Sequence, residues 1–176
     1  MWDEVPMLWT VATVVYLLLE HGNREPKHGM WLPLGLFAYA VVATYATAFQ
    51  DGNSQWFSFH TFFAALELPC LYLVYCFYQR LDSSEAILRA TLSRGFWCYV
   101  VAIGLWAIDL NCCRTLQIIP GYDFFNLHSF GWHLFVSAGL YIMLLSMWYH
   151  RLQTVLGVKV KLVPGVVPFL QLQKDD

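Results

Sequence analysis

A few ionisable side chains lie inside otherwise apolar stretches of this chain, and their types and spacing could support chemistry. They are Asp3, Glu4, His60, Glu67, Asp109, His128 and His133. Charged groups within membrane spans are costly to bury, so they commonly mark a binding site, a proton relay or a catalytic centre. His128 and His133 stand out, because two imidazoles with a carboxylate at similar depth suit a borderline-soft ion such as zinc.

Some of these residues also have simple structural interpretations. His60 follows Trp56 by four positions and could be an interfacial histidine beside that ring. Asp109 could pair with Arg114 or accept a hydrogen bond from Asn111, which would make it a structural contact. The two histidines are the least easily explained in this way.

The composition indicates which elements must position these residues. Of the 176 residues, 59% are hydrophobic, 18% aromatic and only 12% charged. Soluble domains carry about 25% charged residues, so a water-facing surface is hard to assemble from this chain. The apolar content excludes a disordered chain, and a net charge of −2 gives no reason to expect a nucleic-acid partner. We therefore expect an all-α integral membrane protein with one helical domain.

Apolar runs of about 20 residues are long enough to cross a bilayer as helices. The sequence contains candidate spans at about 2–19, 31–49, 56–78, 95–119 and 126–149. We expect residues 1–156 to form this transmembrane domain, and residues 157–176 to form a cytoplasmic or interfacial tail. Asp82 and Glu85 resemble a helix N-cap with its capping-box glutamate, so the fourth helix could begin before the apolar run.

Basic residues set the expected orientation. Of the 10 lysines and arginines, all but Arg114 fall on one side of this topology. They are Arg24, Lys27, Arg80, Arg89, Arg94, Arg151, Lys159, Lys161 and Lys174. Because basic loops are retained in the cytoplasm, we expect the C-terminus there and the first residues on the opposite side.

Three segments carry a resemblance to a known family. Residues 3–7 are similar to the Asp-Glu-x-Pro-Met signature of the alkaline ceramidases, membrane hydrolases related to the adiponectin-receptor group. Residues 106–113 resemble the Trp-x-x-Asp-x-x-x-Cys signature of that family, and residues 127–141 resemble its two-histidine signature. The order of the spans also matches, so the resemblance covers nearly the whole chain.

The resemblance implies a seven-helix hydrolase that cleaves the amide bond of ceramide to sphingosine and a fatty acid, with this chain matching the last five helices. It implies that His128 and His133 bind Zn²⁺ and that Asp3 is the catalytic carboxylate that contacts the metal-bound water. Asp109 and Glu4 become candidates for residues that orient the metal ligands or the catalytic carboxylate through hydrogen bonds. The implied partners are ceramide or a related lipid and the membrane itself, of the endoplasmic reticulum or Golgi.

Two features of the family pattern differ in this chain. The family's third zinc ligand, in a Ser-x-x-x-His motif, and its acidic calcium-binding segment have no counterpart here, although catalytic zinc commonly has three protein ligands. The family spaces its last two histidines four residues apart, whereas His128 and His133 are five apart. Four residues turn an α-helix by about 40° and five by about 140°. A π-bulge near Gly131, or a position of His128 just before the helix, would restore convergence.

Two other functional classes are compatible with the same residues. One is a non-catalytic membrane receptor or scaffold of the same superfamily, whose polar cluster is structural. The other is a small proton-coupled carrier that uses Glu67 and Asp109 as relays near the midplane. Glu67 also has a structural interpretation, as a protonated carboxyl bonded to backbone freed by Pro69.

Overall fold

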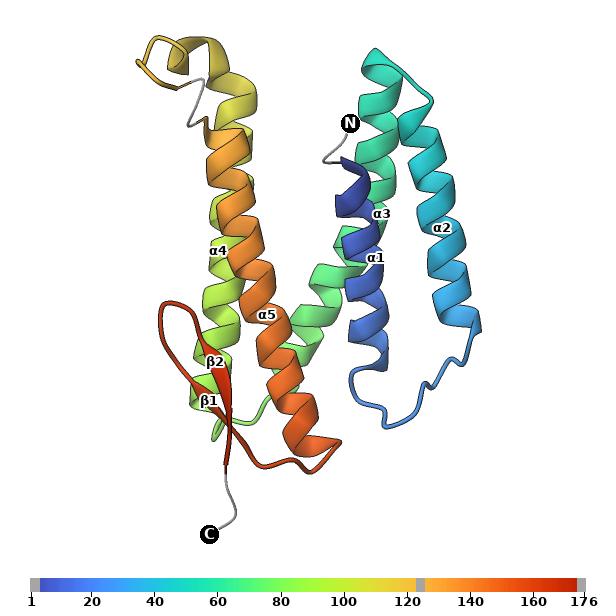
Figure 1. Ribbon diagram of the computed structural model, residues 1–176, viewed down its shortest axis with the longest axis vertical. Helices are drawn as coiled ribbons and strands as arrows, with labels where there is room; N and C mark the ends of the chain where they lie inside the picture. The colour runs from blue at the N-terminus through green and yellow to red at the C-terminus, as the bar shows by residue number, and fades with distance from the viewer. Residues whose placement is uncertain (1–3, 123–125, 174–176) are drawn as a thin grey trace. The chain divides into compact units, whose positions relative to one another are not determined.

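The computed structural model describes residues 4–122 and 126–173. About 73% of the chain is helical, which confirms the expected all-α membrane bundle. The chain divides into two compact units, Met1–Arg80 and Leu81–Asp176, and each is described by itself. Figure 1 shows the helices of both units.

The first unit is a bundle of three helices. They are α1 (Glu4–Glu20), α2 (Trp31–Ala48) and α3 (Gly52–Arg80), and each contacts the other two. These bounds lie within a few residues of the first three predicted spans, because uninterrupted apolar runs satisfy their backbone hydrogen bonds internally only as helices.

The core of this bundle forms where the three helices meet. Leu8, Ala43 and Phe59 are buried together, one from each helix. The indole nitrogen of Trp9 donates a 3.0 Å hydrogen bond to the hydroxyl of Thr44, which joins α1 to α2. Apolar packing and a half-buried hydrogen bond therefore both join α1 to α2.

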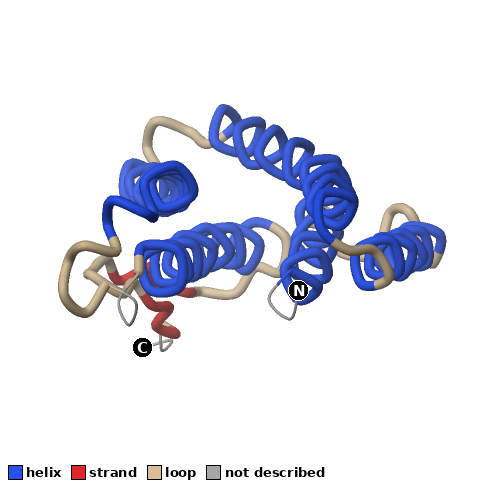
Figure 2. The backbone as a smooth tube through the Cα atoms, turned by 90° about the horizontal axis from the view of Figure 1, so that it is seen from above, coloured by secondary structure: helices blue, strands red, loops and turns tan. Residues whose placement is uncertain are grey.

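The second unit combines two long helices with a short hairpin. Its elements are α4 (Ala86–Leu116), the π-helix η1 (Leu127–Trp132), α5 (His133–Thr154), and strands β1 (Val160–Val163) and β2 (Phe169–Leu172). The strands pair antiparallel and are the only sheet in the described part of the chain (Figure 2). α4 and η1–α5 contact each other along their length.

The predicted early start of the fourth helix is confirmed. α4 begins at Ala86, well before the apolar run that starts at Gly95. The carboxylate of Glu85 accepts a 3.1 Å hydrogen bond from the backbone N–H of Asp82, and the carboxylate of Asp82 accepts one of 3.1 Å from Ser84. These bonds order the turn before α4, but the N-cap residue is Glu85, which makes no side-chain capping bond, so the N-cap indicated at Asp82 was wrong.

Two glycines let α4 and α5 approach closely. A Cβ atom added at Gly139 would lie 2.8 Å from the carbonyl oxygen of Gly95 and 3.1 Å from the backbone nitrogen of Tyr99. A Cβ at Gly95 would lie 2.9 Å from the side chain of Met143. Small residues at such crossings allow the backbone contact that drives helix association in lipid.

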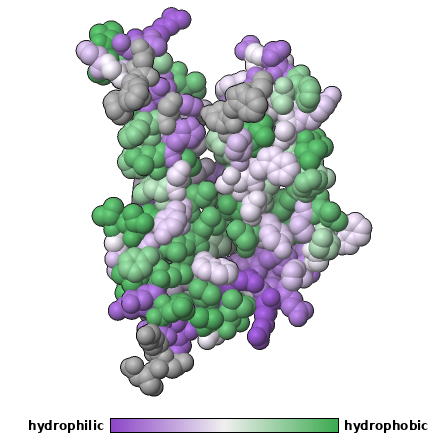
Figure 3. Space-filling view, in the orientation of Figure 1, coloured by the Kyte–Doolittle hydropathy of each residue, from purple (hydrophilic) through white to green (hydrophobic). Residues whose placement is uncertain are grey.

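Four helical segments are long and apolar enough to cross a membrane: Trp31–Ala48, Gly52–Arg80, Ala86–Leu116 and Phe130–Thr154. α1, with 17 described residues, is not among them, so the structure supports four of the five predicted spans. Their outer faces carry exposed large apolar side chains, including Trp31 and Trp97. On the face in Figure 3, hydrophobic residues follow the helices, and the most hydrophilic residues gather near helix ends. Such surfaces are suited to lipid contact.

The segment after α5, expected as an interfacial or loosely ordered tail, forms the β1–β2 hairpin and packs against α5. Val160 and Leu162 are buried on its inner side. The hydroxyl of Tyr141 donates a 2.8 Å hydrogen bond to the carbonyl of Pro168, and the amide of Gln153 donates one of 2.9 Å to Val160. Two points of attachment along α5 therefore hold the hairpin.

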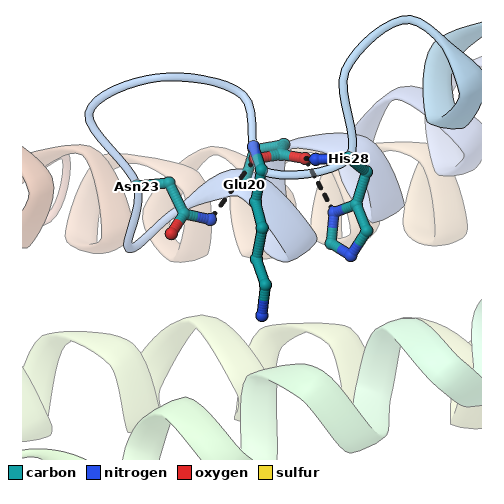
Figure 4. A network of polar contacts seen from close by, with 4 residues as sticks. Glu20, Asn23 and His28 are labelled. Carbon is teal, nitrogen blue, oxygen red and sulfur yellow. Dashed lines mark hydrogen bonds and ion pairs between the residues drawn. The ribbon is translucent and has the colours of Figure 1, made fainter.

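A single carboxylate organises the loop between α1 and α2. Glu20 is only 7% exposed, and its oxygens accept hydrogen bonds from the backbone N–H groups of Lys27 (2.7 Å) and His28 (3.1 Å). Figure 4 shows Asn23 and the His28 ring turned toward the same carboxylate, with Nδ1 of His28 at 2.8 Å. The Lys27 N–H, helped by His28 and Asn23 and opposed by burial, lowers the Glu20 pKa from 4.5 to about 2.

This lowered pKa predicts a loop that loosens in acid. A group whose pKa falls on folding stabilises the folded loop above its unfolded pKa and loses that effect as it is protonated. We expect the amides of Lys27 and His28 to lose hydrogen-exchange protection as the pH falls from 4.5 toward 2. Glu20→Gln should remove this pH dependence, whereas Glu25→Gln, an exposed change in the same loop, should retain it. Unchanged protection of wild-type protein across this range would contradict the prediction.

Candidate functional site

His128 and His133 lie side by side in the second unit. Their ring centroids are 5.9 Å apart, and the ring planes are inclined at 79°. His128 lies within η1 (Leu127–Trp132), and His133 is the first residue of α5. Of the two arrangements considered from the sequence, the structure has a π-helical turn between the histidines. A π-helix pairs residue i with residue i+5, so one widened turn brings a five-residue spacing onto one face.

The ring geometry fits two ligands of one metal ion. An imidazole nitrogen at about 2.1 Å from zinc places two ring centres on a tetrahedral ion about 5 Å apart. The observed 5.9 Å is within about 1 Å of that value, a difference that small side-chain rotations accommodate. Gly131 lets this turn pack closely against α4. A Cβ at this position would lie 3.1 Å from the side chain of Leu105.

Asp109 is connected to the start of this π-helix through Tyr122. The hydroxyl of Tyr122 donates to a carboxylate oxygen of Asp109 and accepts a 3.4 Å hydrogen bond from the backbone N–H of Leu127. Tyr122 is buried, and that burial, with the bond to Asp109, raises the pKa of its hydroxyl. The phenol therefore stays protonated as a donor and links α4 to the residue before His128.

Tyr122 was not singled out from the sequence. It follows a Pro-Gly turn between two apolar runs, where a tyrosine is typical of an interfacial anchor, so no local signal indicated its bond to Asp109. The expected partners of Asp109 were Arg114 and Asn111, but the amide of Asn111 donates instead to the carbonyl of Ala107. The loop after α4 must fold back before Tyr122 can reach the carboxylate.

Removing the Tyr122 hydroxyl tests this link. We expect Tyr122→Phe to cost about 1–2 kcal/mol of stability, because a half-buried carboxylate and a backbone N–H each lose a partner. Hydrogen exchange at Leu127 and in the following turn should accelerate. Asp109→Asn is the control, since its amide oxygen can still accept the hydroxyl. Equal exchange at Leu127 in Tyr122→Phe and wild-type protein would show that the hydroxyl does not hold the turn.

The other sequence-predicted residues belong to the first unit. Asp3 lies outside the described residues. Glu4 begins α1, and its carboxylate accepts a 2.9 Å hydrogen bond from the amide of Gln55 on α3. His60 stacks on Trp56, with ring centroids 4.1 Å apart, and its Nδ1 lies 2.7 Å from the Trp56 carbonyl. The interpretation of His60 as a histidine beside Trp56 is thus confirmed.

The histidine pair provides two donors rather than a full three-ligand set. Within residues 4–122 and 126–173, no group of three or more His, Cys, Asp or Glu side chains is placed to hold one ion. The pair has the donor type that zinc prefers and a compatible ring separation, and no third such donor joins it among the described residues.

Long apolar helices with an imidazole pair at one end of a helix define the class as a helical integral membrane protein with a candidate metal centre. The family model described as Ceramidase matches residues 1–160, and the chain therefore belongs to the ceramidase family. Comparisons with curated proteins and with solved structures gave no significant match. Family membership supports hydrolysis of ceramide as the general activity and a lipid as the substrate.

Proposed function

We propose that this chain carries the two-histidine part of a zinc centre that hydrolyses the amide bond of ceramide, giving sphingosine and a fatty acid. The observation that carries the proposal is the π-helical turn, which brings His128 and His133 to a ring separation of 5.9 Å despite their five-residue spacing. π-turns are rare and occur frequently at functional sites. The ceramidase family supplies the substrate class.

Each residue of the proposed site has a distinct task. As the family resemblance implies, His128 and His133 would hold the ion through their ring nitrogens, and Asp3 would contact its bound water. Bound zinc would lower the pKa of that water toward 7 and polarise the amide carbonyl. Asp109, through Tyr122, holds the backbone just before His128.

Support from the first unit is less direct. Glu4 follows Asp3 and is tied to Gln55, so the start of α1 is anchored on α3. We place the C-terminus in the cytoplasm, from the basic loops, and the protein in the membrane of the endoplasmic reticulum or Golgi.

The test is a paired measurement on purified wild-type protein in lipid nanodiscs. Zinc content is determined by elemental analysis, and release of fatty acid from ceramide is followed with and without a zinc chelator. We expect bound zinc and chelator-sensitive hydrolysis. Protein without zinc or hydrolysis would favour the receptor or scaffold class. Proton flux that persists without either histidine would favour the carrier.

A further inference from the structure

Arg94, near the start of α4, has two guanidinium nitrogens that are buried without a hydrogen bond in the described part of the chain. Its Nε and Nη2 atoms are buried and have no hydrogen-bond partner among the described residues. A buried polar group without a partner costs about 1–3 kcal/mol, and more when it is charged. Arginine stays protonated even when buried, so it cannot avoid this cost by losing its charge. An anionic ligand at this position would remove the cost.

Arg94 lies on the face of α4 that contacts α5. It precedes Cys98 by one helical turn, and the Cβ of Cys98 would lie 3.4 Å from a Cβ at Gly139. Residues four apart share a helix face, so Arg94 is on the α4 face that meets α5. The guanidinium therefore belongs to the region where α4 contacts α5.

The charges at this end of the second unit favour an anion. We call it the basic end: the start of α4, the end of α5 and the hairpin. Among its described residues, the basic side chains are Arg89, Arg94, Arg151, Lys159 and Lys161, and the carboxylates are Asp82 and Glu85. Such an excess of positive charge raises the local concentration of anions. Arg89 donates to the carbonyl of Leu81, so it also braces the turn before α4.

The position of Arg94 in the sequence puts it near the expected membrane boundary. Arg94 immediately precedes the apolar run that begins at Gly95, and Trp97, three residues later, is 61% exposed. Tryptophan is enriched at the level of lipid headgroups. An arginine at this depth is within reach of a headgroup phosphate, and its planar fork can bind phosphate through two parallel N–H···O bonds.

We propose that Arg94 binds the phosphate of an anionic phospholipid headgroup, at a site separate from the histidine pair. Basic pockets between membrane helices on the cytoplasmic side are suited to this ligand. Arg94 lies near the start of α4, whereas His128 and His133 lie in η1 and at the start of α5, so lipid binding at Arg94 does not depend on ceramide hydrolysis.

Lipid retention tests the proposal directly. Wild-type protein, Arg94→Gln, Arg94→Lys and Lys161→Gln are reconstituted in nanodiscs of phosphatidylcholine mixed with phosphatidylglycerol. Lipids that stay bound are then counted by native mass spectrometry. We expect wild-type protein to retain phosphatidylglycerol selectively, and Arg94→Gln to lower that selectivity by about 10-fold, the value of one charge-assisted hydrogen bond. Lys161→Gln removes the same charge from an exposed position and should change it little.

Thermal unfolding provides a second measurement. Phosphatidylglycerol should raise the unfolding temperature of wild-type protein above its value in phosphatidylcholine alone, and this increment should be smaller in Arg94→Lys, which lacks the planar fork. A matched series in phosphatidylcholine with inorganic phosphate separates the two phosphate sources, and we expect no increment there. An equal increment with inorganic phosphate would overturn the lipid assignment. No lipid selectivity in wild-type protein, or equal loss in Lys161→Gln and Arg94→Gln, would overturn the site.

Discussion

Replacing His133 by alanine is expected to abolish stoichiometric zinc and to lower ceramide hydrolysis at least about 100-fold, since even residues that support a metal ligand change affinity or activity by about 10–100-fold. His133 is the first residue of α5, at the junction with the π-turn. Alanine is a good helix former, so the turn should keep its backbone while losing one imidazole. Helical content measured by circular dichroism should therefore be unchanged.

A matched control is His60→Ala, which removes an imidazole from a different helix. His60 contacts Trp56, so its loss should affect local packing and leave zinc and hydrolysis near wild-type levels. Full zinc and full activity in His133→Ala would refute the proposed metal centre. Equal loss in both variants would indicate a general effect on folding.

The role of the π-turn can be separated from the role of the side chains. Deleting Phe130, an exposed residue between the histidines, gives a four-residue spacing that an ordinary α-helix places on one face. Inserting one alanine after Phe130 gives six residues, which an α-helix separates by about 120°. We expect the deletion to retain zinc and the insertion to lose it. The reverse order would show that the widened turn is not what makes the pair converge.

The second large effect is expected from Gly139→Ala. The added methyl would meet the backbone carbonyl of Gly95 at 2.8 Å and the backbone nitrogen of Tyr99 at 3.1 Å. Backbone atoms cannot rotate away as a side-chain end can, so α4 and α5 must separate. Overpacking of this kind costs about 1–3 kcal/mol, and Gly139→Leu should cost more. The loss should appear as a lower unfolding temperature in detergent or nanodiscs.

Gly104→Ala is the appropriate comparison. Gly104 lies within α4, but a Cβ there would have no atom within 4 Å. Alanine at such a position should leave stability unchanged or raise it by about 0.5–1 kcal/mol, because glycine is a poor helix former. If both variants unfold at the wild-type temperature, the close approach of α4 and α5 does not stabilise the second unit.

The fold class and helix positions followed from the sequence because they depend on local properties. Apolar runs separated by polar, glycine-containing loops can satisfy their backbone in lipid only as helices. α2 begins at Trp31, as predicted, and the capping pattern at Asp82 and Glu85 predicted the early start of α4. The first predicted span is a helix, but α1 has 17 described residues and is not among the helices long enough to cross a membrane.

The hairpin after α5 could not be predicted from local sequence properties. Val160 and Leu162 alternate with lysines in the expected strand pattern, but a strand needs a partner and a surface to cover. Both came from tertiary contacts: pairing with residues 169–172 and the hydrogen bonds from α5 through Tyr141 and Gln153. Without these contacts, a segment of this composition is expected to form an interfacial tail.

By itself, the sequence determined that this protein is an apolar helical bundle of the ceramidase pattern, with His128 and His133 as its candidate metal-binding pair. It left open whether a five-residue spacing could bring them together, because an α-helix separates such residues by about 140°. Only the tertiary structure decided this. Packing of Gly131 against Leu105 and the bonds of Tyr122 accompany a widened helical turn, and backbone hydrogen-bond register, rather than residue type, sets the face on which each imidazole lies.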